Sequence, residues 1–296
     1  MEKSTNQKAG RPRLPGHLLK KVRLGGETFR LKRLLRSLEV ATVCEQALCP
    51  NISECFEAGE LTFMIMGSVC TRDCRFCGVK TGTAVPLDPD EPQKVATAAK
   101  RLGLKYIVLT SVTRDDLPDG GAGHVAACIR LLREKLPAAG VEALVPDFGG
   151  DPRSLRTVLE AGPDVLGHNM ETVRRLYPLA RPRSDYTRSL EVLRSASRAE
   201  DILIKSGFMV GLGESDTEIL QLMRDIRRAG CRMLTIGHYL PPTAGHLALV
   251  SPHPPEKFEE YRDQALKLGF RSVRSGVFVR SSHRACEQWW EARREK

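Results

Sequence analysis

From about residue 61, short apolar runs alternate with amphipathic stretches of helical length, and this rhythm limits the possible folds more than any other feature. The expected strands are 61–67, 106–110, 142–148, 165–169, 203–211 and 232–239. The expected helices are 93–102, 123–136, 152–161, 187–199, 215–229 and 256–268. Strands that alternate with helices pair in parallel through right-handed crossovers. The pattern therefore predicts an α/β fold, either a partial (β/α)6 TIM-type barrel or a doubly wound sheet.

Polar and reactive side chains stand at the ends of these expected strands. They are Cys70, Thr110, Ser111, Asp147, His168, Asn169, Lys205, His238 and Tyr239. In a (β/α) barrel the carboxyl ends of the strands converge on one site, so residues that are distant in sequence meet there. This distribution favours the barrel over the doubly wound sheet.

The same rhythm divides the chain into three expected parts. Residues 1–60 lack it and carry a separate group of cysteines, so we interpret them as an N-terminal extension; 61–270 form the barrel and 271–296 a C-terminal segment. The first forty residues are basic and poor in acid, which fits a short basic arm or an organelle transit peptide. They contain no apolar signal-peptide core, and no apolar run reaches membrane-spanning length. We expect a cytoplasmic protein that does not bind membranes.

A formal net charge of +10 raises the question of nucleic-acid binding. Lys and Arg are spread along the chain, aromatic residues make up only 5%, and no nucleic-acid-binding motif accompanies them. A basic surface serves equally well to dock a small acidic protein. The composition therefore favours an acidic protein partner over nucleic acid.

Six of the nine cysteines lie between residues 44 and 77, and without an export signal such clustering indicates metal rather than disulfides. Cys70, Cys74 and Cys77 form a C-x3-C-x2-C run directly after the first expected strand. Three thiolates on one short loop hold three irons of a cubane cluster and leave the fourth iron open to a chelating small molecule. Structural zinc needs a fourth ligand, and no Cys or His follows closely. The run resembles that of the radical S-adenosylmethionine (SAM) superfamily.

Cys44, Cys49 and Cys55 form a second trio, C-x4-C-x5-C, with Pro50 and Asn51 after its second cysteine. Alone, this trio fits either an iron–sulfur cluster or a structural metal site that cross-links the chain. Together with the first trio it resembles the lipoyl synthase family, and the likeness runs from about residue 18 to residue 285.

The resemblance implies that the second trio holds an auxiliary [4Fe–4S] cluster whose fourth ligand is a serine near the C-terminus. The matching residue is Ser282, in the run Arg280-Ser281-Ser282-His283. Serine is a hard oxygen ligand for an iron that thiolates usually hold. A loosely held iron suits a cluster that is consumed as a source of sulfur, which is the role that the family assigns to it.

The activity that the resemblance implies is that of a sulfurtransferase of lipoate biosynthesis and protein lipoylation. It inserts two sulfur atoms, at C6 and C8, into a protein-bound octanoyl-lysine. Cleavage of SAM at the first cluster yields a 5′-deoxyadenosyl radical that removes hydrogen from the acyl chain. The implied partners are an acidic octanoylated carrier (a lipoyl domain or H-protein), an electron donor such as flavodoxin or ferredoxin, and an iron–sulfur cluster carrier. No general acid or base is implied.

The implied contacts to SAM lie at the strand ends and in the loops that follow them. They are Phe76, Thr110, Ser111, Arg114, Asn169, Glu171, Lys205 and Tyr239. Three positions depart from the family pattern: Gly167 replaces an Asn, His238 lies where Gln is usual, and His283 follows the two serines in place of Tyr. None of them removes an expected cluster ligand, so they bear on substrate and turnover more than on the radical chemistry.

Two other functions fit the same residues. The first is a diverged radical SAM sulfur-insertion enzyme with another substrate, which Gly167 keeps open. The second is a non-catalytic iron–sulfur protein, which predicts clusters without SAM cleavage and leaves a barrel-sized remainder unexplained. A zinc-stapled nucleic-acid binder comes last, because zinc would need a distant fourth ligand.

Overall fold

The computed structural model describes residues 14–20 and 25–294, so residues 1–13 and 21–24 of the basic N-terminal arm lie outside the described residues. At its centre is a sheet whose strands are, in spatial order, β1 (Ala41–Thr42), β2 (Thr62–Ile65), β5 (Tyr106–Ser111), β6 (Gly140–Leu144), β7 (Val165–Gly167), β8 (Leu203–Val210), β9 (Met233–His238) and β10 (Ser272–Gly276). Neighbouring strands from β2 to β10 pair in parallel, whereas β1 is antiparallel to β2.

The parallel strands lie side by side in the order of the chain. A doubly wound sheet reverses its strand order at a switch point, so this topology excludes it. Among the described strands no pairing joins β1 to β10, and the barrel stays open. The predicted partial barrel is therefore confirmed, with all six expected strands and all six expected helices present. The third expected strand ends early, at Leu144, because Pro146 and a turn at Asp147 follow it.

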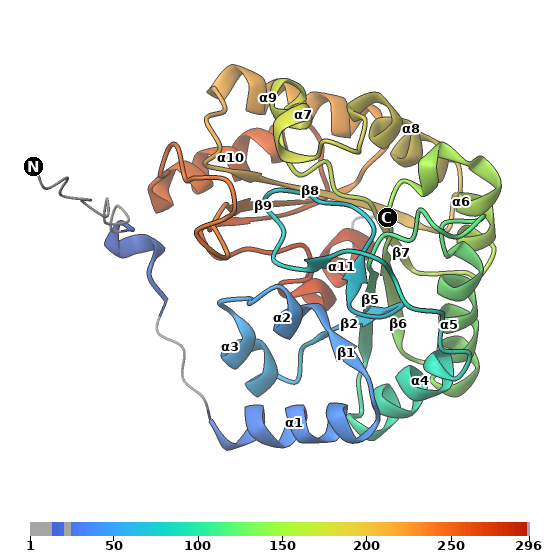
Figure 1. Ribbon diagram of the computed structural model, residues 1–296. Coiled ribbons are helices and arrows are strands. Elements are labelled where there is room, and N and C mark those ends of the chain that lie inside the picture. Colours follow the sequence, from blue (N-terminus) through green and yellow to red (C-terminus); the bar gives the residue numbers. More distant parts are fainter. Residues whose placement is uncertain (1–13, 21–24, 295–296) are drawn as a thin grey trace, which may run out of the picture.

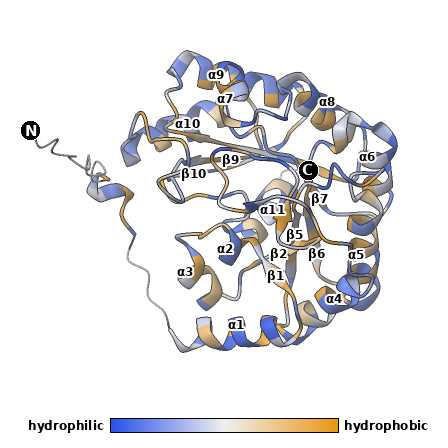
Figure 2. Ribbon diagram, viewed as in Figure 1, coloured by the Kyte–Doolittle hydropathy of each residue, from blue (hydrophilic) through white to orange (hydrophobic). Residues whose placement is uncertain are grey.

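Helices cover the outer face of the sheet (Figure 1). They are α4 (Glu91–Arg101), α5 (Ala122–Lys135), α6 (Pro152–Leu159), α8 (Tyr186–Ala196), α9 (Asp216–Arg228) and α10 (Pro255–Lys267). Hydrophilic and hydrophobic residues alternate along them (Figure 2). In α9, which begins with a capping box at Ser215, the buried residues recur at helical spacing, so one face packs inward. In the described part of the chain, no helix has both the length and the apolar character needed to span a membrane.

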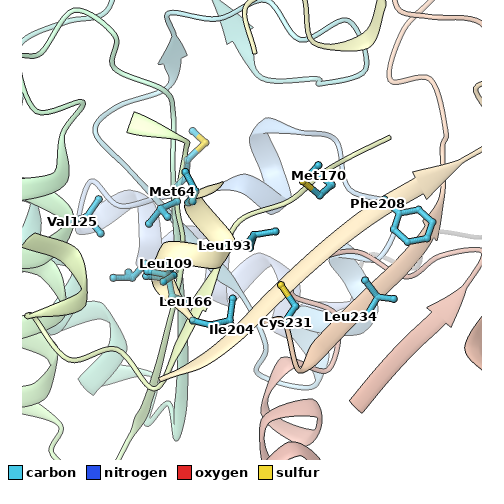
Figure 3. Packing of buried hydrophobic residues seen from close by; sticks show 14 of the residues in the cluster. Met64, Leu109, Val125, Leu166, Met170, Leu193, Ile204, Phe208, Cys231 and Leu234 are labelled. Carbon is cyan, nitrogen blue, oxygen red and sulfur yellow. The ribbon is translucent and has the colours of Figure 1, made fainter. Parts of the chain in front are cut away.

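The main core lies between the sheet and these helices (Figure 3). Leu109, Leu166, Ile204 and Leu234 come from β5, β7, β8 and β9, and they share the core with Leu193 of α8. Side chains alternate between the two faces of a strand, so the residues on either side of these core leucines and isoleucine face the interior of the barrel. The interior face is where the polar strand residues collect.

The described part of the first sixty residues adds an edge strand and three α-helices to the barrel, besides a 3-10 turn at Gly16–Leu18. The helices are α1 (Gly26–Ser37), α2 (Val43–Gln46) and α3 (Ile52–Glu57). Ala41 and Thr42 pair with Met64 and Phe63 of β2, so the extension joins the sheet directly. The Thr42 side chain then accepts a hydrogen bond from the Glu45 backbone and caps α2. This fixes the start of the second cysteine trio against the barrel.

The C-terminal segment has three structural roles. Its first residues form β10, which extends the sheet beside β9. Residues 277–284 then return toward the cysteines, and α11 (Ala285–Arg294) follows. Trp289 of α11 packs on Tyr106 at 5.2 Å between ring centroids and forms a small apolar cluster with Val165 and Met233. These are residues of the amino-terminal end of the strands, so α11 plugs that end of the barrel. The division at residues 270 and 271 stays a prediction.

Candidate active site

Two adjacent cavities lie at the carboxyl end of the strands. The Cys70 cavity has a volume of about 220 Å³, and Cys70, Cys74 and Cys77 all line it. The Cys44 cavity has a volume of about 370 Å³ and is lined by Cys44, Cys49 and Ser282, among others. The residues that line both are Val43, Phe76, Cys77, Thr110, Leu144, Asn169 and Glu171. The two cysteine trios, which are separate in sequence, therefore belong to one continuous site.

The first trio sits on a loop whose ends are held together by a short parallel pair, β3 (Val69–Cys70) and β4 (Lys80–Thr81). The Cys70 Sγ accepts hydrogen bonds from the backbone N–H groups of Arg72, at 3.4 Å, and Thr113, at 3.3 Å. Hydrogen bonds to the charged form of a side chain favour that form. Cys70 is thus surrounded as a thiolate ligand of a metal needs to be.

Arg72 anchors this loop to the barrel. Its guanidinium lies 2.7 Å from Asp115 and 2.7 Å from Asp147, and Arg188 donates to the other Asp147 oxygen at 2.7 Å. Burial acts to raise the pKa of Asp147, but the two arginines prevail and hold that pKa well below its usual range. Asp147 is therefore a permanent anion, fully buried, that ties the cysteine loop to the end of β6.

The thiols of both trios fit iron–sulfur clusters. Burial raises the pKa of Cys44, Cys55 and Cys77 to about 12. Such thiols stay protonated until a cation binds, and a metal supplies the positive charge that makes them thiolates. Burial also raises the pKa of Cys74, against which the Arg181 charge acts. All nine cysteines are free of disulfides, so the donors are available.

The second trio comes from α2, the turn after it and α3. Cys44 lies in α2 and Cys55 in α3, with Cys49 between them. Burial raises the pKa of Cys55, and Cys49 and Cys44 act on that pKa in the same direction. Cys44 and Cys49 line the Cys44 cavity, whereas Cys55 does not.

Asn51 ties the second trio to the C-terminal segment. Its Nδ2 donates to the Phe278 carbonyl at 2.6 Å, and the residue is only 1% exposed. Four residues further along the chain, Ser282 lines the Cys44 cavity. The neighbouring Ser281 accepts a hydrogen bond from Asn169 Nδ2 at 2.6 Å. The segment that contains the expected serine ligand is therefore held from both sides.

The Cys70 cavity contains polar atoms that have no protein partner. Among the described residues, Ser111 Oγ, His168 Nε2 and Arg181 Nε are buried without a hydrogen bond, and all three residues line this cavity. Arg181 is held in place by bonds from its Nη1 to the Asn169 carbonyl and the Tyr177 hydroxyl, at 3.0 and 2.9 Å. Buried polar groups are normally satisfied, so this wall fits a polar ligand with its own donors and acceptors.

Glu171 stands between the two cavities in a strained conformation. Its φ is 67°, in the left-handed region that residues other than glycine rarely adopt. Its backbone bonds to Gly207 and Met209 of β8 hold it there. Burial raises the pKa of Glu171, and the charge of Arg181 opposes this. Strain of this kind persists where the surrounding structure imposes it, typically at functional sites.

Most of the expected SAM contacts reach the cavities. Phe76, Thr110, Asn169 and Glu171 line both, Ser111 lines the Cys70 cavity and Tyr239 the Cys44 cavity. Two residues are placed elsewhere. Arg114 pairs with Asp116 at 2.8 Å, and Lys205 pairs with Glu142 at 2.8 Å. Neither lines a cavity, so their expected contact with SAM stays a prediction.

Sequence analysis gave no role to Glu142 and noted Asn51 only as part of a motif. Glu142 lines the Cys44 cavity from the middle of β6, and Asn51 joins the two ends of the chain. An acidic residue within an otherwise apolar strand was the signal for Glu142. Asn51 carried no comparable signal, because its partner is the backbone of a residue 227 positions away.

His238, which lies where the family usually has Gln, is a neutral hydrogen-bonded residue in the wall of the Cys44 cavity. Its Nδ1 donates to the Tyr239 carbonyl at 2.8 Å, and its Nε2 accepts from the His253 backbone N–H at 2.9 Å. Burial lowers the pKa of His238 from 6.5 to about 4. A glutamine side chain can make the same two bonds, because it also has one donor group and one acceptor.

We expect His238→Gln to flatten the dependence of stability on pH between 6.5 and about 4. The unfolded chain takes up a proton on His238 in this window and the folded chain does not, so folding stability falls as the pH falls. The variant lacks this uptake of one proton. Urea unfolding at several pH values measures the slope for both proteins; equal slopes would contradict the assignment of a buried, neutral His238.

Comparison with known proteins agrees with this geometry. The family model of the Radical SAM superfamily matches residues 64–226, and the model described as the N-terminal domain of lipoyl synthase of the Radical SAM family matches residues 1–49. The crystal structure of methylornithine synthase is similar in fold, with a TM-score of 0.56 at 16% identity over 84% of this chain and 72% of that one. Fold and site thus define a radical SAM enzyme.

Curated relatives show which family of radical SAM enzymes the chain belongs to. A lipoyl synthase from Rubrobacter xylanophilus is 50% identical over 97% of this chain and 90% of the relative. Another, from Caldanaerobacter subterraneus subsp. tengcongensis, is 51% identical over 90% of this chain and 94% of the relative. The chain therefore belongs to the lipoyl synthase family, whose chemistry is radical SAM-dependent insertion of sulfur.

Proposed function

We propose that the chain inserts two sulfur atoms, at C6 and C8, into an octanoyl group carried on a lysine of another protein. Cys70, Cys74 and Cys77 would hold the cluster that binds SAM, and Cys44, Cys49, Cys55 and Ser282 the auxiliary cluster. The observation that supports this most is the shared wall of the two cavities, since radical formation and sulfur supply must meet at one acyl chain.

The clusters, when bound, supply the electron that cleaves SAM and the sulfur that is inserted. The protein's own residues bind and orient the reactants. Ser111, His168 and Arg181 present unpartnered polar atoms to the amino-acid and ribose groups of SAM. Val108, Leu144 and other apolar residues of the Cys44 cavity give the acyl chain a dry environment, which protects a radical from side reactions with solvent.

The carrier would be an acidic lipoyl domain or H-protein, which the net charge of +10 supports. An electron donor such as flavodoxin or ferredoxin and an iron–sulfur cluster carrier complete the proposed partners, with the cytoplasm as the proposed location. Exposed Leu48, on the rim of the Cys44 cavity, adds an apolar contact beside the entry for the acyl-lysine arm.

Mass spectrometry of an octanoyl-lysyl peptide tests this function. The anaerobically reconstituted protein is incubated with SAM, a reductant and the peptide, and 5′-deoxyadenosine is measured in parallel. We expect a peptide with two added sulfur atoms. Cleavage of SAM with an unchanged peptide would indicate a diverged enzyme with another substrate, and fully loaded clusters without cleavage would indicate a non-catalytic protein.

A further inference from the structure

A buried ion pair lies beneath the Cys44 cavity and takes no part in the cluster sites. Lys205 Nζ is 2.8 Å from Glu142 Oε1, and the Tyr106 hydroxyl donates to the other Glu142 oxygen at 2.8 Å. Glu142 and Lys205 are each 1% exposed. Glu142 lines the Cys44 cavity, so its side chain forms part of the cavity wall.

Behind this ion pair the barrel is closed. Tyr106 packs against Trp289 of α11, and a Cβ added to Gly140 would lie 2.6 Å from the Tyr106 ring. Val165, Met233 and Leu203 fill the remaining space around Trp289. The ion pair is therefore the boundary between the cavity and the plugged end of the barrel, and a ligand cannot pass beyond it.

Directly above this boundary, Leu144 occupies the space that Gly167 leaves. Gly167 is paired in the sheet with Leu144 on one side and Lys205 on the other. A Cβ added to Gly167 would lie 3.2 Å from Leu144 Cδ1, closer than an ordinary contact. Leu144 is also one of the residues that line both cavities. Its side chain thus stands where the two cavities meet, with its position set by the missing side chain at 167.

We propose that Leu144, seated against Gly167 above the Glu142–Lys205 pair, sets the length of acyl chain that the enzyme accepts. This inference rests on the proposed function, because it assigns the far end of the acyl chain to this place. An octanoyl chain ends against Leu144. A longer chain must displace Leu144 or press its methyl end onto buried charges, and burying charge against apolar groups without compensation is unfavourable.

Two variants are expected to change the accepted chain length in opposite directions. Leu144→Ala removes the side chain against which the acyl chain ends and leaves room for about two further methylene groups. The kcat/KM for decanoyl-lysyl peptide should therefore rise relative to that for octanoyl-lysyl peptide. Gly167→Ala adds a Cβ that pushes Leu144 into the cavity. The kcat/KM for hexanoyl-lysyl peptide should then rise relative to that for octanoyl-lysyl peptide. Each methylene in an apolar pocket discriminates by about 10-fold or more, so we expect the ratio of kcat/KM between neighbouring peptides to shift by at least about 10-fold.

The experiment measures 5′-deoxyadenosine and sulfur-containing product with hexanoyl-, octanoyl- and decanoyl-lysyl peptides for each protein. Leu166→Ala is the matched control, because Leu166 precedes Gly167 in β7 but packs in the outer core. This control is expected to lower stability without changing the chain-length preference. If Leu144→Ala and Gly167→Ala only destabilised the protein, they would keep the wild-type chain-length preference, as the control is expected to do.

The outcomes separate this inference from the function on which it rests. Opposite shifts in Leu144→Ala and Gly167→Ala, with none in Leu166→Ala, support it. Wild-type protein that modifies octanoyl peptide, together with variants that keep the wild-type preference, overturns the inference alone. Wild-type protein that cleaves SAM but modifies none of the peptides overturns the proposed function and the inference with it.

Discussion

We expect replacement of Cys74 by alanine to abolish release of 5′-deoxyadenosine, and replacement of Cys49 by alanine to preserve that release but abolish insertion of sulfur. The two residues lie in separate trios on separate cavities, Cys74 in the Cys70 cavity and Cys49 in the Cys44 cavity. A cubane held by three cysteines loses its site when one is removed. Each variant should therefore bind roughly half the iron of the wild type and fail at a different step.

Anaerobic reconstitution followed by iron analysis and mass spectrometry of nucleoside and peptide measures both effects. Cys128→Ala is a suitable control, since Cys128 is fully buried in α5, among apolar residues and away from both cavities. It should keep the full iron content and both activities. Loss of 5′-deoxyadenosine release in both trio variants alike would show that the two sites do not act separately, and would contradict the division of roles between the trios.

Replacing Asp147 by asparagine is expected to destabilise the fold by about 3–5 kcal/mol, because it leaves the buried guanidinium of Arg72 without one of its two charged partners. Asp147 is fully buried, and Arg72 and Arg188 each approach it within 2.7 Å. Since Arg72 belongs to the cysteine loop, the variant should also retain less iron in the first cluster site. Chemical denaturation and iron content at fixed protein concentration measure the two consequences.

A surface pair provides the comparison. Glu191 and Arg194 form an ion pair on α8 in which both side chains are about half exposed. Glu191→Gln should change stability by no more than about 1 kcal/mol, because solvent screens exposed pairs. If Asp147→Asn were as mild as this control and kept its full iron content, the Arg72–Asp147–Arg188 network would not be what holds the cysteine loop.

The structure places the expected cluster ligands and the expected cofactor contacts differently with respect to the two cavities. Cysteine spacing is a local property of the chain, and all six cysteines of the trios except Cys55 line the two cavities. The expected SAM contacts came from the family resemblance, and for Lys205, which lines neither cavity, that contact stays a prediction. Its partner, Glu142, lies 63 residues earlier in the chain, and the pairing becomes visible only when β6 and β8 are seen on either side of β7.

By itself, the sequence determined the class of barrel and the two sets of cysteines. The periodicity of apolar residues shows, over short stretches of chain, whether a segment buries one face as a helix or as a strand. The short spacing between cysteines in turn limits which metal sites they can form. Only the tertiary structure decided which polar groups face a cavity, how Asn51 and Ser281 hold the C-terminal segment, and why Leu144 fills the space at Gly167. These are contacts between distant residues, and a buried polar or apolar group takes whichever partner the topology brings within reach.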